Sequence, residues 1–196
     1  MADGVGSVIV CIIGHGPSLI GRKMGDHIDA YDIVVRMKGC GPVLGTEDYG
    51  SRVDHLCMTT EVQGLAKAVL AGSYWLYPKN GKYDELQTFE AIADHGAPFM
   101  IPKKLMNHWN DEFRKLNPSH PNVSTGMASI IIAAHYYEPM EIHLGGFDTL
   151  LNPDIEFTRH PDVPRSGFGP FVHDWKAENK LLDKVREAYS LKIVPL

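Results

Sequence analysis

Short apolar runs of strand length alternate along this sequence with amphipathic stretches of helix length. Alternation of this kind is typical of an α/β domain in which helices flank a mostly parallel sheet. We therefore predict an α/β fold of this type. The strands are predicted at residues 8–14, 33–37, 55–59, 73–77, 98–101, 140–145 and 191–194, and the helices at residues 61–70, 83–95, 104–116, 125–136 and 174–189.

Length, charge and cysteine content indicate the number of domains, the class of partner and the compartment. With 196 residues, 44% of them hydrophobic, the chain can build one buried core but is short for two, so residues 1–196 are expected to form a single domain. A formal net charge of -5 predicts no nucleic acid partner. The three cysteines show no CxxC spacing, and the N-terminal apolar run is too short for a signal peptide or a membrane span. We therefore expect a cytoplasmic protein without a membrane span.

Two stretches, residues 39–52 and 148–172, are rich in glycine or proline and lack strand or helix periodicity. They are predicted to be loops. Long loops in a compact domain are usually functional, and in an open α/β sheet the ligand binds above the carboxyl ends of the strands.

Glycines follow the first predicted strand directly, in the turn Gly14-His15-Gly16-Pro17-Ser18. Glycines in this position let backbone N–H groups approach a phosphate or a sugar closely. The next glycine, Gly21, is out of place for a dinucleotide fingerprint, and the second predicted strand ends in Arg36-Met37-Lys38, where an NAD site needs an acidic residue. The pattern disfavours NAD, and a plain turn without a ligand stays an alternative.

Two predicted helices begin with polar residues that suit a binding site. Ser124 or Thr125 can cap the apolar helix that follows, and the small residues there, including Gly126, present free N–H groups to an anion. An ordinary capped core helix is the alternative. The last helix begins near His173 and Asp174, where a partly exposed imidazole can act as a general base and Glu178 can either orient it or bond to free N–H groups.

The order and spacing of these features resemble a known family. Residues 11–52, with the core IDAYDIVVRM and the end GSR, resemble the large sialyl motif of the animal-type sialyltransferases. Residues 124–147, STGMASIIIAAHYYEPMEIHLGGF, are similar to the small sialyl motif. His173 and Glu178, five positions apart, reproduce the very short motif. The resemblance covers roughly a third of the chain.

The resemblance implies a Rossmann-like fold of the GT-A variant and an inverting transfer of a sugar from a CMP-activated donor to a glycan acceptor. His173 would be the catalytic base, assisted by Glu178, and His160 would bind the donor phosphate. No metal ion or other cofactor is expected, because the chain has no Asp-x-Asp pair. The residues implied to bind the nucleotide or donor are Gly14, His15, Gly16, Ser18, Arg36, Lys38, Ser124, Thr125 and Gly126.

The sequence also departs from the family pattern. His15 and Lys38 stand where the family usually has asparagine, and Tyr137 stands where the animal enzymes carry a cysteine of their inter-motif disulfide. The short segment between motifs and the missing membrane anchor favour a bacterial or viral member. Its donor is expected to be CMP-sialic acid or another CMP-linked acidic sugar such as CMP-Kdo. A CMP-sugar hydrolase of the same fold and a non-catalytic nucleotide-binding module remain alternatives.

Overall fold

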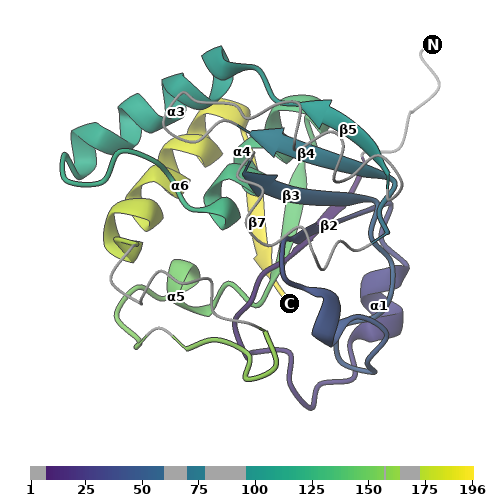
Figure 1. The fold of residues 1–196 in the computed structure, drawn as a ribbon. Helices are drawn as coiled ribbons and strands as arrows, with labels where there is room; N and C mark the ends of the chain where they lie inside the picture. The colour runs from purple at the N-terminus through teal and green to yellow at the C-terminus, as the bar shows by residue number, and fades with distance from the viewer. Residues whose placement is uncertain (1–7, 60–69, 78–95, 157, 164–172) are drawn as a thin grey trace, which may run out of the picture.

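A seven-stranded sheet forms the centre of the molecule (Figure 1). The computed structural model describes residues 8–59, 70–77, 96–156, 158–163 and 173–196. The strand order is β5-β4-β3-β2-β1-β6-β7, and every neighbouring pair in it is parallel, which confirms the predicted α/β class. The strands are β1 (Val10–Ile13), β2 (Ile33–Met37), β3 (His55–Thr59), β4 (Ser73–Tyr77), β5 (Ala97–Met100), β6 (Glu141–Gly145) and β7 (Lys192–Pro195).

All seven predicted strands are present. The predictions for β2, β3 and β4 match to the residue, β5 and β7 are shifted by one residue, β6 is one residue shorter than predicted and β1 is three residues shorter. Parallel strands buried on both faces appear in the sequence as continuous apolar runs. Such runs predict that a strand is present better than they predict where it begins and ends.

Three long helices begin and end close to their predicted positions: α3 (Lys103–Leu116), α4 (Thr125–Tyr137) and α6 (Trp175–Tyr189). The side chains of Ser124 and Asp174 cap α4 and α6, as the sequence predicted, by accepting the N–H groups of Met127 and Ala177. The predicted helices at residues 61–70 and 83–95 lie outside the described residues, except for Leu70. None of the described helices is long and apolar enough to cross a membrane.

Three short helices correct the prediction: α1 (Gly25–Asp29), η1 (Gly41–Val43) and α5 (Asp148–Leu151). The last two fall inside stretches that were predicted to be loops. Helices of three to five residues are too short to show a hydrophobic period, so no sequence pattern marks them.

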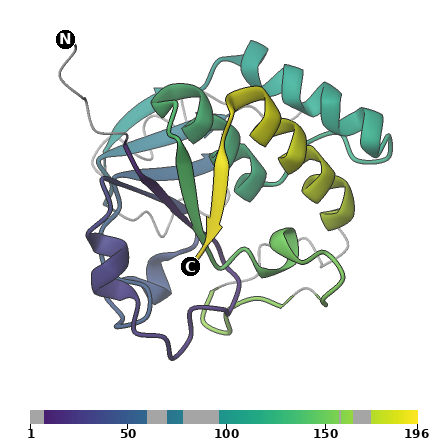
Figure 2. The same ribbon diagram turned by 180° about the vertical axis from the view of Figure 1, so that it is seen from behind.

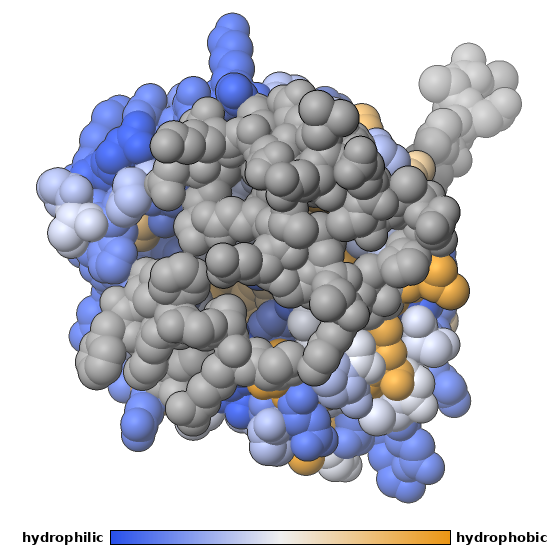
Figure 3. Space-filling view, in the orientation of Figure 1, coloured by the Kyte–Doolittle hydropathy of each residue, from blue (hydrophilic) through white to orange (hydrophobic). Residues whose placement is uncertain are grey.

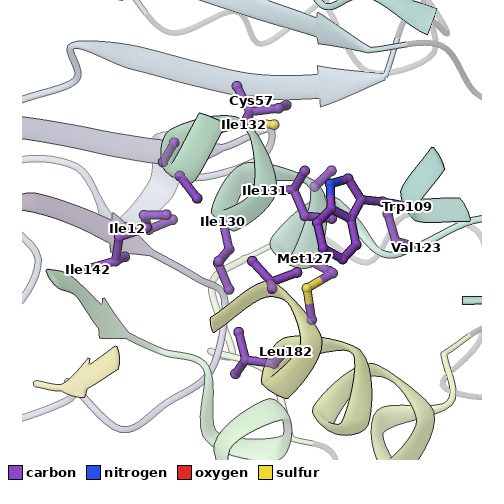
Figure 4. Close-up of a cluster of buried hydrophobic side chains, with 14 of the residues drawn as sticks. Ile12, Cys57, Trp109, Val123, Met127, Ile130, Ile131, Ile132, Ile142 and Leu182 are labelled. Carbon is purple, nitrogen blue, oxygen red and sulfur yellow. The ribbon is translucent and has the colours of Figure 1, made fainter. Parts of the chain in front are cut away.

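The core has two layers, one on each side of the sheet (Figure 2). Because side chains alternate along a strand, Val10 and Ile12 of β1 face α3, α4 and α6, whereas Cys11 and Ile13 face α1 and η1. Helix α4 lies closest to the sheet, and eight of its residues are buried. In the close-up of this layer, Met127 lies between Trp109 and Leu182, which belong to the two outer helices (Figure 4).

The chain topology defines where a ligand can bind. From β1 the chain passes outward through β2, β3 and β4 to β5, and it then returns to place β6 on the other side of β1. The connections therefore diverge at the carboxyl ends of β1 and β6, and ligands of open α/β sheets bind at such a topological switch point.

The described surface around the rim of the face in Figure 3 is mostly hydrophilic, with apolar side chains in small separate areas.

Candidate active site

The glycine turn after β1 packs directly against the turn after β6. The N–H groups of Gly14 and Gly16 donate to the carbonyl oxygens of Gly145 and Gly146 at 2.7 and 2.8 Å. A Cβ atom placed on Gly14 would lie 2.3 Å from the oxygen of Gly146, which no real Cβ atom tolerates. These glycines therefore permit contact between two turns. Their N–H groups are already bonded, which corrects the prediction that they are available to a phosphate.

His15 lies in this turn beside the carboxyl end of β2. Burial, followed by the positive charge of Arg159, lowers the pKa of His15 to about 4, so its imidazole is neutral near pH 7. Its Nε2 atom is buried and has no hydrogen-bond partner among the described residues. His15 can therefore offer a ligand a neutral hydrogen-bonding group but no positive charge.

His160 lies next to the same turn, as the family resemblance implied for a donor-binding residue. Its backbone N–H donates to the carbonyl oxygen of His15 at 2.8 Å, and its ring meets the ring of Tyr49 edge to face, with centroids 5.2 Å apart. The Nδ1 atom accepts the N–H of Asp162 at 3.1 Å. In the neutral ring the proton is therefore on Nε2, which makes that atom a hydrogen-bond donor.

Arg36 is not placed to bind a nucleotide, which corrects the prediction. Its side chain is fully buried on the α1 side of the sheet, where Nε donates to the carbonyl oxygen of Arg52 at 2.8 Å and NH2 to that of Tyr49 at 2.5 Å. Arg36 therefore anchors the loop before β3. Arg52 is also structural, because it donates to the carbonyl oxygens of Asp29, Tyr31 and Asp32.

Lys38 and Ser18 lie nearer the switch point. Lys38 follows β2 and is half-buried, with its Nζ atom 3.5 Å from Oγ1 of Thr59 at the end of β3. Ser18 is exposed, and its hydroxyl accepts the N–H of Gly146 at 3.2 Å. Lys38 is thus the predicted basic residue that lies at the carboxyl edge of the sheet.

The start of α4 lies over the carboxyl ends of the central strands. Ser124 Oγ caps the helix by accepting the N–H of Met127 at 3.1 Å, and Thr125 Oγ1 accepts the hydroxyl of Tyr77 at 2.9 Å. A Cβ atom placed on Gly126 would lie 2.9 Å from the ring of Phe147. The first turn of this helix therefore directs its positive dipole end toward the switch point.

Glu178 joins α6 to the start of α4. Its carboxylate is fully buried and accepts both the N–H of Ser124 (2.8 Å) and the hydroxyl of Ser124 (2.6 Å). The sequence left two roles open for Glu178, namely to orient His173 or to bond to free N–H groups. These bonds correspond to the second role, except that the N–H group belongs to another helix. Burial raises the pKa of Glu178 to about 7, and the bonds from Ser124 oppose that rise.

His173 lies just before α6, with its side chain about one third exposed. Its Nδ1 atom is 3.8 Å from Oε1 of Glu178, and its ring centroid is 5.0 Å from that of Trp175. One carboxylate oxygen of Glu178 therefore faces both the imidazole of His173 and the backbone of Ser124, so the structure brings the predicted base and the predicted donor-binding helix together.

Phe147 connects the two groups of predicted residues. Its ring contacts the start of α4 at Gly126 and the glycine turn at Gly14, since Cβ atoms placed there would lie 2.9 and 3.0 Å from ring atoms. The glycine turn, with His15 and His160, is therefore adjacent to the helix that Glu178 holds.

Sequence reasoning did not identify Phe147, Tyr49 or Tyr77 as site residues. The only available signal for Phe147 was its position directly after an apolar strand and two glycines. Within the described parts of the chain, no group of three or more His, Cys, Asp or Glu side chains is arranged to hold a metal ion.

This combination of a parallel sheet, a glycine turn at the switch point and a capped helix start defines an α/β protein with a candidate ligand site at the switch point. Residues 6–74 match the family model of glycosyltransferase family 29 (sialyltransferase). That segment includes the glycine turn and the first three strands. No curated protein sequence matches the chain significantly.

Two solved structures of a mammalian sialyltransferase share the fold. One, in complex with Gal-beta-1-3GalNAc-ortho-nitrophenol, has a TM-score of 0.61 and 17% identity, and the match covers 95% of this chain and 69% of that chain. The other has a TM-score of 0.63 and 20% identity, with 95% and 68% covered. The family model therefore supports the resemblance to the sialyltransferases over residues 6–74, and the two structures show that the chain shares their fold.

The raised pKa of Glu178 predicts how stability depends on pH. Its folded-state pKa of about 7 lies above the ordinary value of 4.5, so the folded protein binds the proton more tightly. The contribution of Glu178 to stability should therefore fall as the pH rises from about 4.5 to about 7, by about 3 kcal/mol if the full shift applies. Glu178→Gln removes this dependence. The difference in free energy of unfolding between wild type and variant, measured with urea, should therefore change between pH 4.5 and pH 7.

Glu112→Gln is the matched control. Hydrogen bonds from Lys115 and then Lys184 lower the pKa of Glu112 to about 2, so its contribution to stability levels off above about pH 5.5, where the contribution of Glu178 is still falling. A difference between wild type and Glu178→Gln that levels off in the same way would contradict the assignment of a raised pKa to Glu178.

Proposed function

We propose that this protein transfers an acidic sugar from a CMP-activated donor to a hydroxyl of a glycan, with inversion at the anomeric carbon. The main support is the bonding of Glu178, which lies within ion-pair distance of His173 and accepts two hydrogen bonds from Ser124. The buried carboxylate of Glu178 thus contacts both the candidate base, His173, and the start of α4, which is suited to binding a phosphate. CMP-sialic acid and CMP-Kdo are the donors that the family resemblance favours.

The proposed reaction begins at His173. A sugar hydroxyl is too weak an acid to ionise near pH 7, so a neutral imidazole within hydrogen-bond reach removes its proton as the oxygen attacks the anomeric carbon. With a pKa of about 7, Glu178 is partly ionised near pH 7, and its carboxylate form stabilises the imidazolium that forms. The bond from the anomeric carbon to the donor phosphate breaks, and CMP leaves with the electron pair.

The leaving phosphate gains negative charge and needs donors that are already in place. Lys38 and the start of α4 supply positive potential at the carboxyl edge of the sheet, and Nε2 of His160 supplies a hydrogen bond. His15 remains neutral and is proposed to contact the nucleotide through a hydrogen bond.

CMP should bind in preference to NAD. The residue that follows β2 is the basic Lys38 rather than the acidic residue that binds the ribose of NAD. Calorimetry should detect CMP binding, weakened by Lys38→Gln. Lys23→Gln is the control, because Lys23 pairs with Glu47 and is 76% exposed. Binding of NAD with no heat from CMP would refute the donor assignment.

Turnover should not require a divalent metal, because the donor phosphate is proposed to be held by Lys38, His160 and helix N–H groups. Product formation from a CMP-sugar should be the same in EDTA as in buffer with magnesium or manganese. Complete loss in EDTA that either ion restores would show that a metal takes part.

His160→Ala should lower turnover by about 10²-fold or more while the fold is retained, since it removes the hydrogen-bond donor to the leaving phosphate. His108→Ala is the control because His108 is exposed on α3. Circular dichroism and thermal unfolding report the fold. Turnover within a few-fold of wild type would assign the phosphate contact to another group, such as Arg159 or Arg165.

His173→Ala should abolish transfer, at a loss of about 10² to 10⁴ in kcat, because the acceptor hydroxyl loses its base. CMP affinity and thermal stability should stay close to wild type, since the His173 side chain is partly exposed. The assay uses a panel of glycan acceptors and a sample without acceptor, so that hydrolysis and transfer are measured separately. A variant that keeps transfer within a few-fold would remove His173 from the mechanism.

A further inference from the structure

A continuous chain of side-chain hydrogen bonds lies outside the candidate site, on the α1 side of the sheet. Nε2 of His27 is 3.1 Å from the hydroxyl of Tyr31, which is 2.7 Å from Nδ1 of His143. Nε2 of His143 is 3.1 Å from Oε1 of Glu141, and Oε2 of Glu141 accepts the ammonium of Lys192 at 2.9 Å. The chain thereby joins α1 and the segment before β2 to β6 and β7.

The acceptor at one end of this chain fixes the direction of its hydrogen bonds. An ionised carboxylate only accepts, so Nε2 of His143 carries a hydrogen toward Glu141. In the neutral ring, Nδ1 of His143 is then an acceptor for the hydroxyl of Tyr31. The oxygen of Tyr31 in turn accepts from Nε2 of His27. Every group in the chain has a partner in this arrangement.

The same chain can hold one additional proton. If Nδ1 of His143 is protonated, it donates to the oxygen of Tyr31, and the hydroxyl of Tyr31 reverses to donate to His27. This requires only that neutral His27 carries its hydrogen on Nδ1.

A second proton cannot be accommodated. With both histidines charged, two N–H donors point at the one hydroxyl of Tyr31, and its own hydrogen has no acceptor within the chain. A buried polar group without a partner costs free energy, and the two imidazolium rings also repel each other. Tyr31 is 9% exposed, whereas His27 beside it is exposed, so water screens part of the repulsion between the rings and the unpartnered hydroxyl of Tyr31 is the larger cost.

The groups around the chain do not remove this conflict. Burial raises the pKa of Tyr31 to about 12, so its phenol stays protonated and cannot become an anion between two cations. Lys192 adds a further positive charge, and Glu141 is already bonded to both His143 and Lys192. The other titratable or charged groups that interact with Tyr31 are Cys11 of β1 and Arg52, which donates to the carbonyl oxygen of Tyr31.

We propose that His27, Tyr31, His143, Glu141 and Lys192 form a pH-sensitive latch, which ties α1 to β6 and β7 while at most one histidine is protonated and opens when both are. The latch is independent of the proposed sugar transfer. It is nevertheless connected to the switch point, because β6 continues from His143 to Gly145, the residue that accepts the N–H of Gly14. Acid opening would loosen β6 beneath the glycine turn.

A double-mutant cycle at two pH values tests the latch. The stabilities of wild type, His27→Gln, His143→Gln and the double variant are measured by urea unfolding at pH 8 and at pH 5. At pH 8 the two histidines should stabilise each other, with a coupling worth roughly threefold to tenfold in the unfolding equilibrium constant. At pH 5 this coupling should vanish or change sign.

Two further variants make the result specific. Tyr31→Phe keeps the ring but removes the hydroxyl, so the coupling at pH 8 should disappear in that background. His108→Gln on α3 is the matched control, and its effect should add to that of His143→Gln at both pH values. A coupling that is absent at pH 8, equal at the two pH values, or unaffected by Tyr31→Phe would overturn the proposal.

Discussion

The arrangement of the candidate site depends on one buried carboxylate. Glu178 belongs to α6, but its two oxygens accept the backbone and side-chain hydrogens of Ser124 at the start of α4. Burying a charged group is unfavourable unless several donors compensate, and the raised pKa of about 7 shows that the compensation is incomplete. Glu178 fixes the spacing between the starts of α4 and α6. It thereby also fixes the position of His173 relative to Thr125 and Gly126.

A second constraint acts at the other side of the site. The turns after β1 and β6 can approach each other only because Gly14 has no side chain, since a Cβ atom there would overlap the oxygen of Gly146. Phe147 then fills the space between this contact and the start of α4. Close packing of this kind has low compressibility and transmits strain, so the glycine turn and the helix start are held as a unit.

Local features were predictable from the sequence, and long-range ones were not. The strands and the caps Ser124 and Asp174 were found because apolar runs and capping residues act over a few positions. Glu178 was identified as a site residue, but its partner Ser124 is 54 positions away, and no spacing rule connects them. Arg36 was misassigned because its motif position gives no information on burial. Its neighbours Val35 and Met37 face α4, so Arg36 points to the opposite side, where the loop before β3 covers it.

The charges at the two ends of the site differ in a way that fits the proposed transfer. Lys38, Arg159 and the helix dipole of α4 place positive potential at the proposed nucleotide end, and the charges of Arg159 and Lys38 contribute to keeping His15 neutral. At the acceptor end the group that faces His173 is the acidic Glu178. A reaction that leaves negative charge on a phosphate and positive charge on a base is stabilised by this polarity, because each charge develops next to its opposite. The polarity of the site is therefore consistent with the transfer proposed above.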